Sequence, residues 1–263
     1  MINPYLPKPY KIIKIHKETA IDWTFIIEYS GTLIGGQFME ISIPGIGEAP
    51  ISICDFTDNS LSMTIRRVGQ LTDQIFNLKT GDTLYMRGPY GNGFDLELFK
   101  GKDVAIIAGG TGLAPVKKTI DYFVNNKDEI EHLDVLLGFK SPDDILYPDK
   151  IKQWSNTTPI ITTVDDGDDN WTGETGLITT HIAKLKLENV SDKLAIVVGP
   201  PIMMKFTVIE LLKNGFIDEN IWVSFERKMS CGIGKCGHCK IDETYVCTDG
   251  PVFNYTKAKH LID

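Results

Sequence analysis

The sequence predicts a six-stranded antiparallel β-barrel, followed by a parallel-sheet α/β domain and a small C-terminal cysteine-containing loop. Short strand-like segments fill the first hundred residues, strands and helices alternate in the middle of the chain, and four of the five cysteines lie close together near its end. A length of 263 residues suits two domains with a short appendage. We expect the parts at 1–99, 100–224 and 225–263.

The barrel is predicted from six segments that are rich in branched and aromatic residues and are separated by glycine, proline or asparagine turns. They are Tyr10–Lys17, Trp23–Tyr29, Gln37–Ile43, Ile51–Phe56, Leu61–Val68 and Thr83–Arg87. Apolar and polar residues alternate at 61–65, as in a half-buried strand. One short helix is expected at Leu71–Leu78. Six strands and a single helix favour a small antiparallel barrel.

The α/β domain is predicted from strand-like and helix-like segments that take turns along the chain. The expected strands are Val104–Ala108, Leu133–Gly138, Ile160–Val164, Leu194–Val198 and Ile221–Phe225. The expected helices are Ala114–Val124, Asp149–Trp154, Thr179–Leu185 and Met203–Lys213. This alternation indicates a parallel sheet with helices on both faces.

Charge and hydropathy exclude several classes of protein. The chain has 27 basic and 35 acidic residues, a net charge of -8, which argues against a nucleic-acid binder. No stretch approaches the ~20 apolar residues of a membrane helix, and the first residues lack the apolar core of a signal peptide. We therefore expect a cytoplasmic chain without membrane insertion, where clustered cysteines hold metal more often than they form disulfides.

The cysteine cluster has the spacing C-x4-C-x2-C-x7-C, formed by Cys231, Cys236, Cys239 and Cys247. Three thiolates at the four-then-two spacing, with a fourth further on, are typical of plant-type [2Fe–2S] sites. A zinc knuckle is the alternative. Because four thiolates complete the ligand set, we interpret His238 as a bystander. Cys54 is expected to be a small buried hydrophobe of the barrel.

Two loops follow apolar strands and open helices, at 109–115 and 199–203. Such loops place free N–H groups and a helix N-terminus beside the phosphates of a ligand. At the carboxyl edge of one parallel sheet, the pair indicates a nucleotide site. A tight turn that binds no ligand is the alternative for the first loop alone.

Three motifs carry a resemblance to a known family: Pro50-Ile51-Ser52-Ile53, the segment 88–94 and the loop 109–115. With them the chain resembles the ferredoxin–NAD(P)H reductase superfamily, in which a flavin-binding barrel precedes a nicotinamide-binding domain. The segments 225–239 and 249–253 are similar to electron-transfer subunits with a [2Fe–2S] loop. These are the electron-transfer subunits of anaerobic sulfite reductase, of sulfhydrogenase (gamma) and of dihydroorotate dehydrogenase, and the first two look closest. The resemblance covers nearly the whole chain.

The resemblance implies FAD on the barrel, with the hydroxyl of Ser52 near the reactive N5 atom of the flavin. It also implies flavin contacts from Pro50, Ile51 and Ile53, and pyrophosphate contacts from Gly69 and Thr72. The sequence departs from the family where Ala49 replaces an arginine and Ile51 replaces a tyrosine. We expect Arg66, or its neighbour Arg67, to supply the missing positive charge; a solvated strand edge is the alternative.

For the nicotinamide nucleotide, the resemblance implies contacts from Gly110, Thr111, Gly112, Gly199 and Pro200. Glu226 matches an acidic position near the nicotinamide, and a surface charge paired with Arg227 is the alternative. Two acids at 143–144 would repel a 2′-phosphate, so NADH is preferred to NADPH as electron donor. Lysines at 228, 235 and 240 are candidates for steering an acidic partner, and a solvated face is the alternative.

These parts have a common logic, because a nicotinamide releases two electrons as hydride, a cluster accepts one, and a flavin handles both. We therefore expect an electron-transfer subunit that oxidises NADH or NADPH and supplies a terminal reductase subunit, directly or through a ferredoxin-like iron–sulfur subunit. The first expectation for that partner is an anaerobic sulfite reductase; sulfhydrogenase and dihydroorotate dehydrogenase are the alternatives. A zinc-binding regulatory module is the alternative from another class.

Overall fold

The computed structural model describes residues 3–186 and 190–261. Backbone contacts divide the chain into two compact units. The first comprises the residues up to Phe94 together with Glu226–Val252, and the second comprises Asp95–Phe225 together with the residues from Phe253 onward. The cysteine-containing segment thus groups with the barrel, whereas the sequence suggested a part of its own. Every helix in the described ranges is too short or too polar to cross a membrane.

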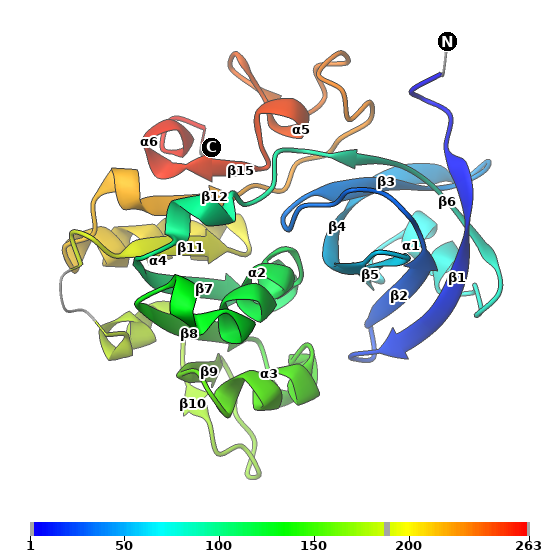
Figure 1. Ribbon diagram of the computed structural model, residues 1–263. Helices are drawn as coiled ribbons and strands as arrows, with labels where there is room; N and C mark the ends of the chain where they lie inside the picture. The colour runs from blue at the N-terminus through cyan, green and yellow to red at the C-terminus, as the bar shows by residue number, and fades with distance from the viewer. Residues whose placement is uncertain (1–2, 187–189, 262–263) are drawn as a thin grey trace. The chain divides into compact units, whose positions relative to one another are not determined.

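The first unit contains the predicted barrel (Figure 1). Its strands are β1 (Lys8–Lys17), β2 (Asp22–Glu28), β3 (Phe38–Ile43), β4 (Gly47–Thr57), β5 (Ser60–Arg66) and β6 (Thr83–Tyr90). They close in the order β1-β2-β5-β4-β3-β6, and every neighbouring pair is antiparallel. The six-stranded antiparallel barrel is therefore confirmed.

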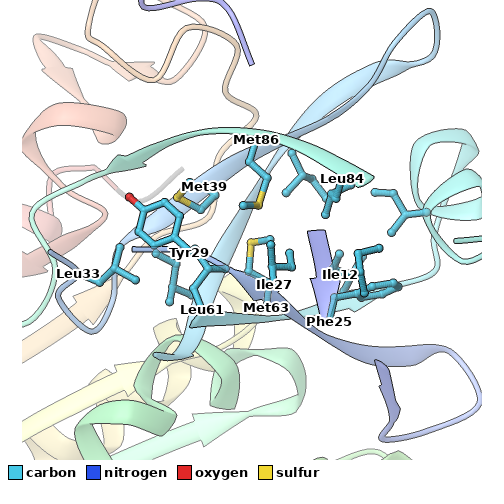
Figure 2. Packing of buried hydrophobic residues seen from close by; sticks show 14 of the residues in the cluster. Ile12, Phe25, Ile27, Tyr29, Leu33, Met39, Leu61, Met63, Leu84 and Met86 are labelled. Atoms are coloured by element: carbon cyan, nitrogen blue, oxygen red, sulfur yellow. The ribbon is translucent and has the colours of Figure 1, made fainter. Parts of the chain in front are cut away.

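The barrel interior is filled by side chains that alternate along the strands. Phe25 and Ile27 of β2 belong to one core cluster with Met39, Met63 and Met86 from three other strands, and all five are fully buried (Figure 2). Full burial of one such side chain contributes about 1.5–3 kcal/mol. Strand residues between these inward-pointing positions face away from the core, which leaves the outer barrel face for other contacts.

The remaining elements of the first unit are short. Helix α1 (Gln70–Ile75) begins and ends earlier than expected. The cysteine-containing segment contributes a two-stranded hairpin of β13 (Lys240–Ile241) and β14 (Thr244–Tyr245), followed by α5 (Val246–Asp249).

The second unit is built on a seven-stranded sheet in the order β10-β9-β8-β7-β11-β12-β15. Its strands are β7 (Asp103–Gly109), β8 (His132–Phe139), β9 (Ile160–Val164), β10 (Glu174–Thr175), β11 (Leu194–Val198), β12 (Ile221–Ser224) and β15 (Val252–Asn254). The five predicted strands are present, and they pair in parallel. The edge strands β10 and β15 were not predicted, because two or three residues are too few to show periodicity.

Helices pack against this sheet, with α2 contacting β7, β8 and β11, and α4 contacting β11. The α-helices are α2 (Leu113–Asn125), α3 (Pro148–Ser155), α4 (Pro201–Lys213) and α6 (Tyr255–Ala258). The 3₁₀ turns are η1 (Leu96–Phe99), η2 (Gly110–Gly112), η3 (Lys127–Glu129), η4 (Pro142–Asp144), η5 (Ile178–Lys184) and η6 (Asp218–Asn220). The expected α-helix at 179–185 is thus wrong in type. It contains two adjacent β-branched threonines, which favour the α-helix poorly.

Candidate functional site

The cysteine-containing segment contributes four thiols to the first unit. The β13–β14 hairpin sets Cys239 directly before β13 and Cys247 within α5. Cys231, Cys239 and Cys247 are buried, whereas Cys236 is exposed. The predicted ligand set therefore has three shielded members and one that faces solvent.

The pKa of Cys231 responds to Cys236 and that of Cys247 to Cys239, so the four thiols lie as two neighbouring pairs. Within residues 3–186 and 190–261, no group of three or more His, Cys, Asp or Glu side chains is placed to hold one metal ion as it stands. Division into pairs matches a cluster of two irons, each bound by two thiolates, better than a single tetrahedral zinc ion. The residues present therefore fit a [2Fe–2S] cluster.

Backbone N–H groups of the loop point at the sulfur atoms. Burial disfavours the thiolate of Cys231, but hydrogen bonds from Ile233, Lys235 and Cys236 outweigh it and lower the pKa of this thiol to about 6. Burial and the contact with its paired thiol raise the pKa of Cys247 to about 12. The first ligand is thus prepared to bind metal as a thiolate.

Glycines make this loop geometry possible at two positions. Gly232 has a φ of 72°, and a Cβ atom there would lie 2.8 Å from the ring of Tyr90. Gly234 has a φ of 68° and donates its N–H to Cys247 Sγ over 3.2 Å. Both positions need the left-handed conformation that glycine adopts without strain. His238 donates its backbone N–H to Cys236 Sγ over 3.5 Å.

The predicted flavin contacts lie on strand β4, on two different faces. Ile53 is fully buried in the barrel core and Ile51 packs against that core, so neither side chain projects outward. Pro50 and Ser52 are half-buried. In the pairing of β3 with β4 they lie opposite Glu40 and Phe38. The outer face of β4 at these two residues is therefore the surface available to a flavin.

The arginines proposed to replace the missing one at Ala49 already have acidic partners. Arg66 donates to both carboxylate oxygens of the buried Asp22, over 2.8 and 2.9 Å. Arg67 donates to Asp73 over 2.6 Å. Arg66 is the better candidate for a phosphate contact, because its charge lies at the end of β5 and its position is fixed by a bidentate pair.

The other predicted residues of the first unit have mixed environments. The Thr72 hydroxyl accepts from the N–H of Gly69 over 3.1 Å and donates to its carbonyl oxygen over 3.0 Å. This hydroxyl caps α1, so a pyrophosphate contact would use the backbone there. Glu226 is exposed, yet desolvation by the surrounding protein raises its pKa, with Arg66 acting in the opposite direction.

The two predicted nucleotide loops lie side by side in the second unit. Ala108 at the end of β7 pairs with Val198 at the end of β11, so the loops that follow share the carboxyl edge of the sheet. A Cβ atom on Gly112 would lie 2.7 Å from the Cα atom of Gly199. Glycine at both positions permits this close approach of the two loops, at the edge where open α/β sheets bind their ligands.

Replacing Gly112 by alanine should weaken NADH binding by at least about tenfold, or about 1.4 kcal/mol, because the methyl group forces the two loops apart. Isothermal titration with NADH measures the effect. Glu28→Ala is the control, because Glu28 is exposed at the end of β2 in the barrel unit. Equal NADH affinity in both variants would contradict a nucleotide site at these loops.

Sequence reasoning missed a charged group on the outer face of the barrel, formed by Glu40, Glu48 and Arg87. Arg87 and Glu40 are buried, and Arg87 donates to both oxygens of Glu48. A charged residue within the apolar run of β3 is the available signal, since an unpaired charge inside a strand is rarely tolerated.

Comparison with known proteins assigns the class of the chain. Residues 106–208 match the oxidoreductase NAD-binding domain, and residues 226–259 match the iron–sulfur cluster binding domain of dihydroorotate dehydrogenase B. The solved NADH-dependent reduced ferredoxin–NADP oxidoreductase has the same fold, with a TM-score of 0.78 and 24% identity, covering 96% of this chain and 92% of that one. The chain is an NAD(P)H-dependent oxidoreductase subunit with a reductase-type fold.

Similar proteins define the family of this chain more narrowly. Sulfhydrogenase 1 subunit gamma of Pyrococcus furiosus is 34% identical, with 96% of this chain and 92% of the relative covered. A probable dihydroorotate dehydrogenase B electron transfer subunit of Methanocaldococcus jannaschii is also 34% identical, with 95% and 91% covered. The chain belongs to this family of electron-transfer subunits in the ferredoxin–NAD(P)H reductase superfamily. FAD, an iron–sulfur cluster and NADH are the cofactors that the matched domains and the fold support.

Proposed function

We propose that this chain oxidises NADH through FAD and passes single electrons through a [2Fe–2S] cluster to a catalytic partner subunit. The observation that carries the proposal is the presence, on one chain, of adjacent nucleotide loops and four cysteines in two thiol pairs. Bound flavin supplies the chemistry that links a two-electron donor to a one-electron acceptor. NADH is preferred to NADPH because of the acidic residues at 143–144.

The side chains have separate tasks in this proposal. Gly110, Thr111, Gly112, Gly199 and Pro200 present backbone groups to the nicotinamide nucleotide at the edge of the sheet. The Ser52 hydroxyl on β4 orients the flavin, and Arg66 balances its phosphate charge. The Glu226 carboxyl group, whose pKa is raised by desolvation, holds a proton at higher pH than an ordinary surface glutamate.

Electrons leave from the exposed side of the cysteine loop. Cys236 is the exposed ligand, and Lys235 and His238 beside it are exposed as well. Lys228 adds positive charge, while Lys240 is partly neutralised by a 3.1 Å contact with its neighbour at 243. The exposed lysines of this segment, above all Lys235 next to the exposed ligand, favour a partner with an acidic docking face.

The similarity to sulfhydrogenase gamma over nearly the whole length of both chains supports a hydrogenase-type partner first. A dihydroorotate dehydrogenase partner is the second candidate, favoured by the match of residues 226–259 to the cluster-binding domain named for that enzyme. Anaerobic sulfite reductase, expected first from the sequence, has less support than either, because these relatives carry other names.

The experiment uses the full chain purified without oxygen. We expect flavin and iron–sulfur absorption, about two iron atoms per chain, and bleaching by NADH faster than by NADPH in stopped-flow mixing. A colourless protein that contains zinc, or a coloured one that NADH does not bleach, would contradict the proposal. Mixing the reduced chain with hydrogenase, dihydroorotate dehydrogenase and sulfite reductase catalytic subunits then identifies the partner by which one reoxidises it.

A further inference from the structure

Arg87 occupies a position that neither nucleotide nor cluster chemistry has so far explained. It lies on β6 directly after the core residue Met86, so its side chain points to the outer face of the barrel. There it is 7% exposed, although a guanidinium group is rarely buried without full hydrogen bonding. The hydrogen-bond partners of this buried cation explain its position.

The N–H groups of the Arg87 guanidinium donate hydrogen bonds in two directions. On one side, Nε donates to Glu48 Oε2 over 2.9 Å and Nη2 donates to the other carboxylate oxygen, which is a bidentate ion pair. On the other side, Nη1 donates to the carbonyl oxygen of Cys231 over 2.5 Å, and Nη2 donates to that of Ser230. The ion pair fixes the plane of the group, and the opposite edge holds two consecutive carbonyls of the cysteine loop.

Two further residues, Tyr90 and Glu40, lie beside Arg87 at its contact with the cysteine loop. The hydroxyl of Tyr90 accepts from Nη1 of Arg87 over 3.1 Å, and its ring lies against Gly232, the residue after the first cysteine. Glu40 is opposite Arg87 in the β3–β6 register and is fully buried, with both carboxylate oxygens unpartnered. The positive charge of Arg87 therefore lies beside two glutamates, the half-buried Glu48 with which it pairs and the fully buried Glu40.

We propose that Arg87 is a positioning residue for the iron–sulfur cluster, which holds the backbone of the first ligand, Cys231, against the flavin-binding barrel. The inference rests on the proposed function in taking Cys231 as a ligand. Lysine cannot replace it fully, because an ammonium group lacks the planar fork that serves a carboxylate and two carbonyls together. The guanidinium charge beside a ligand backbone also favours the reduced, more negative state of a cluster.

The first measurement is amide hydrogen exchange of the peptide covering residues 229–237, in the purified chain and after removal of iron. In wild type, the amides of Ile233, Lys235 and Cys236 are bonded to Cys231 Sγ. We expect Arg87→Met to speed their exchange by about tenfold in both states, and Arg87→Lys to restore protection in part. The control is Lys17→Met, which removes a barrel cation that stacks on Trp23.

The second measurement is the midpoint potential of the cluster, from a redox titration followed by electron paramagnetic resonance. Arg87→Met should lower the ratio of reduced to oxidised cluster about tenfold at a fixed potential, which equals a shift of about 59 mV for one electron. If Arg87→Met fails to fold, Glu48→Gln tests the same contact, because it releases the plane of the guanidinium group. We expect faster exchange of the 229–237 peptide in this variant too.

Wild-type exchange and wild-type potential in the Arg87→Met protein would overturn the inference. The same holds for wild-type exchange in Glu48→Gln, should that variant be the one measured. Failure of the proposed function looks different. Wild-type protein would then not be bleached by NADH, while exchange in the iron-free chain would still respond to the substitution of Arg87.

Discussion

Replacing Cys247 by alanine should reduce the iron content of the purified chain from about two atoms to near none, and should abolish the iron–sulfur absorption. Cys247 is fully buried in α5 and forms the second thiol pair with Cys239. Its loss leaves one iron with a single protein ligand in a site that excludes water. Iron analysis and the visible spectrum measure the result, and flavin absorption should persist.

The matched control is Cys54→Ala, which removes the fifth thiol. Cys54 lies in the barrel, where its thiol donates to the carbonyl oxygen of Ser62 over 3.3 Å. This change should leave iron content unaltered and lower stability by about 1 kcal/mol through the lost contact. Full iron content in Cys247→Ala would show that the four cysteines are not the ligand set.

Replacing Glu40 by glutamine should remove a loss of stability that wild type shows as the pH rises from 5 to 8. Burial raises the pKa of Glu40 from 4.5, the ordinary value for a glutamate, to about 7, while Arg87 opposes the shift and Glu48 and Cys231 add to it. Because the folded-state pKa is the higher one, the stabilising contribution is complete below about pH 4.5 and is lost as pH rises through 7.

The size of this effect follows from the two pKa values. The difference between 4.5 and about 7 corresponds to about 3 kcal/mol in total, of which about 2 to 3 kcal/mol fall between pH 5 and pH 8. Glutamine is neutral throughout, so the free energy of unfolding of Glu40→Gln minus that of wild type should rise by this amount over that interval. Any constant cost of burying the amide cancels in the comparison.

Urea denaturation at several pH values measures the difference. Glu28→Gln is the control, because Glu28 is exposed at the end of β2. The stability of this variant should follow the wild-type pH dependence. A constant difference between Glu40→Gln and wild type from pH 5 to pH 8 would show that Glu40 is ionised equally in the folded and unfolded chain.

The sequence predicts the barrel and the parallel sheet well because each strand carries its own periodic signal. Prediction fails where the signal is short or where tertiary contacts decide. The edge strands β10 and β15 have two and three residues, so pairing alone defines them. At 179–185 the pattern indicates a helix, but the backbone forms 3₁₀ turns over Ile178–Lys184.

The functional site shows the same contrast between features that a local sequence pattern specifies and features that tertiary contacts decide. Spacing alone was sufficient to mark the four cysteines, and chain order to mark the loops at Gly112 and Gly199. Spacing cannot show that Ile53 points into the core or that the Thr72 hydroxyl is used as a helix cap. The contact between Arg87 and Cys231 joins residues 144 positions apart, and no local pattern specifies it.

The discontinuity of the first unit has a consequence for the biosynthesis of the chain. Its barrel is encoded before residue 95, but its cysteine-containing segment is encoded after residue 225, so the whole nucleotide-binding sheet is translated in between. Asn92 donates to the carbonyl oxygen of Val252 over 2.8 Å, so this contact within the unit forms only after residue 252 has been synthesised. Since domains fold largely in order of synthesis, the ligand loop reaches the barrel after the nucleotide-binding sheet has been made. We therefore expect iron to be bound only after the nucleotide-binding sheet has been synthesised.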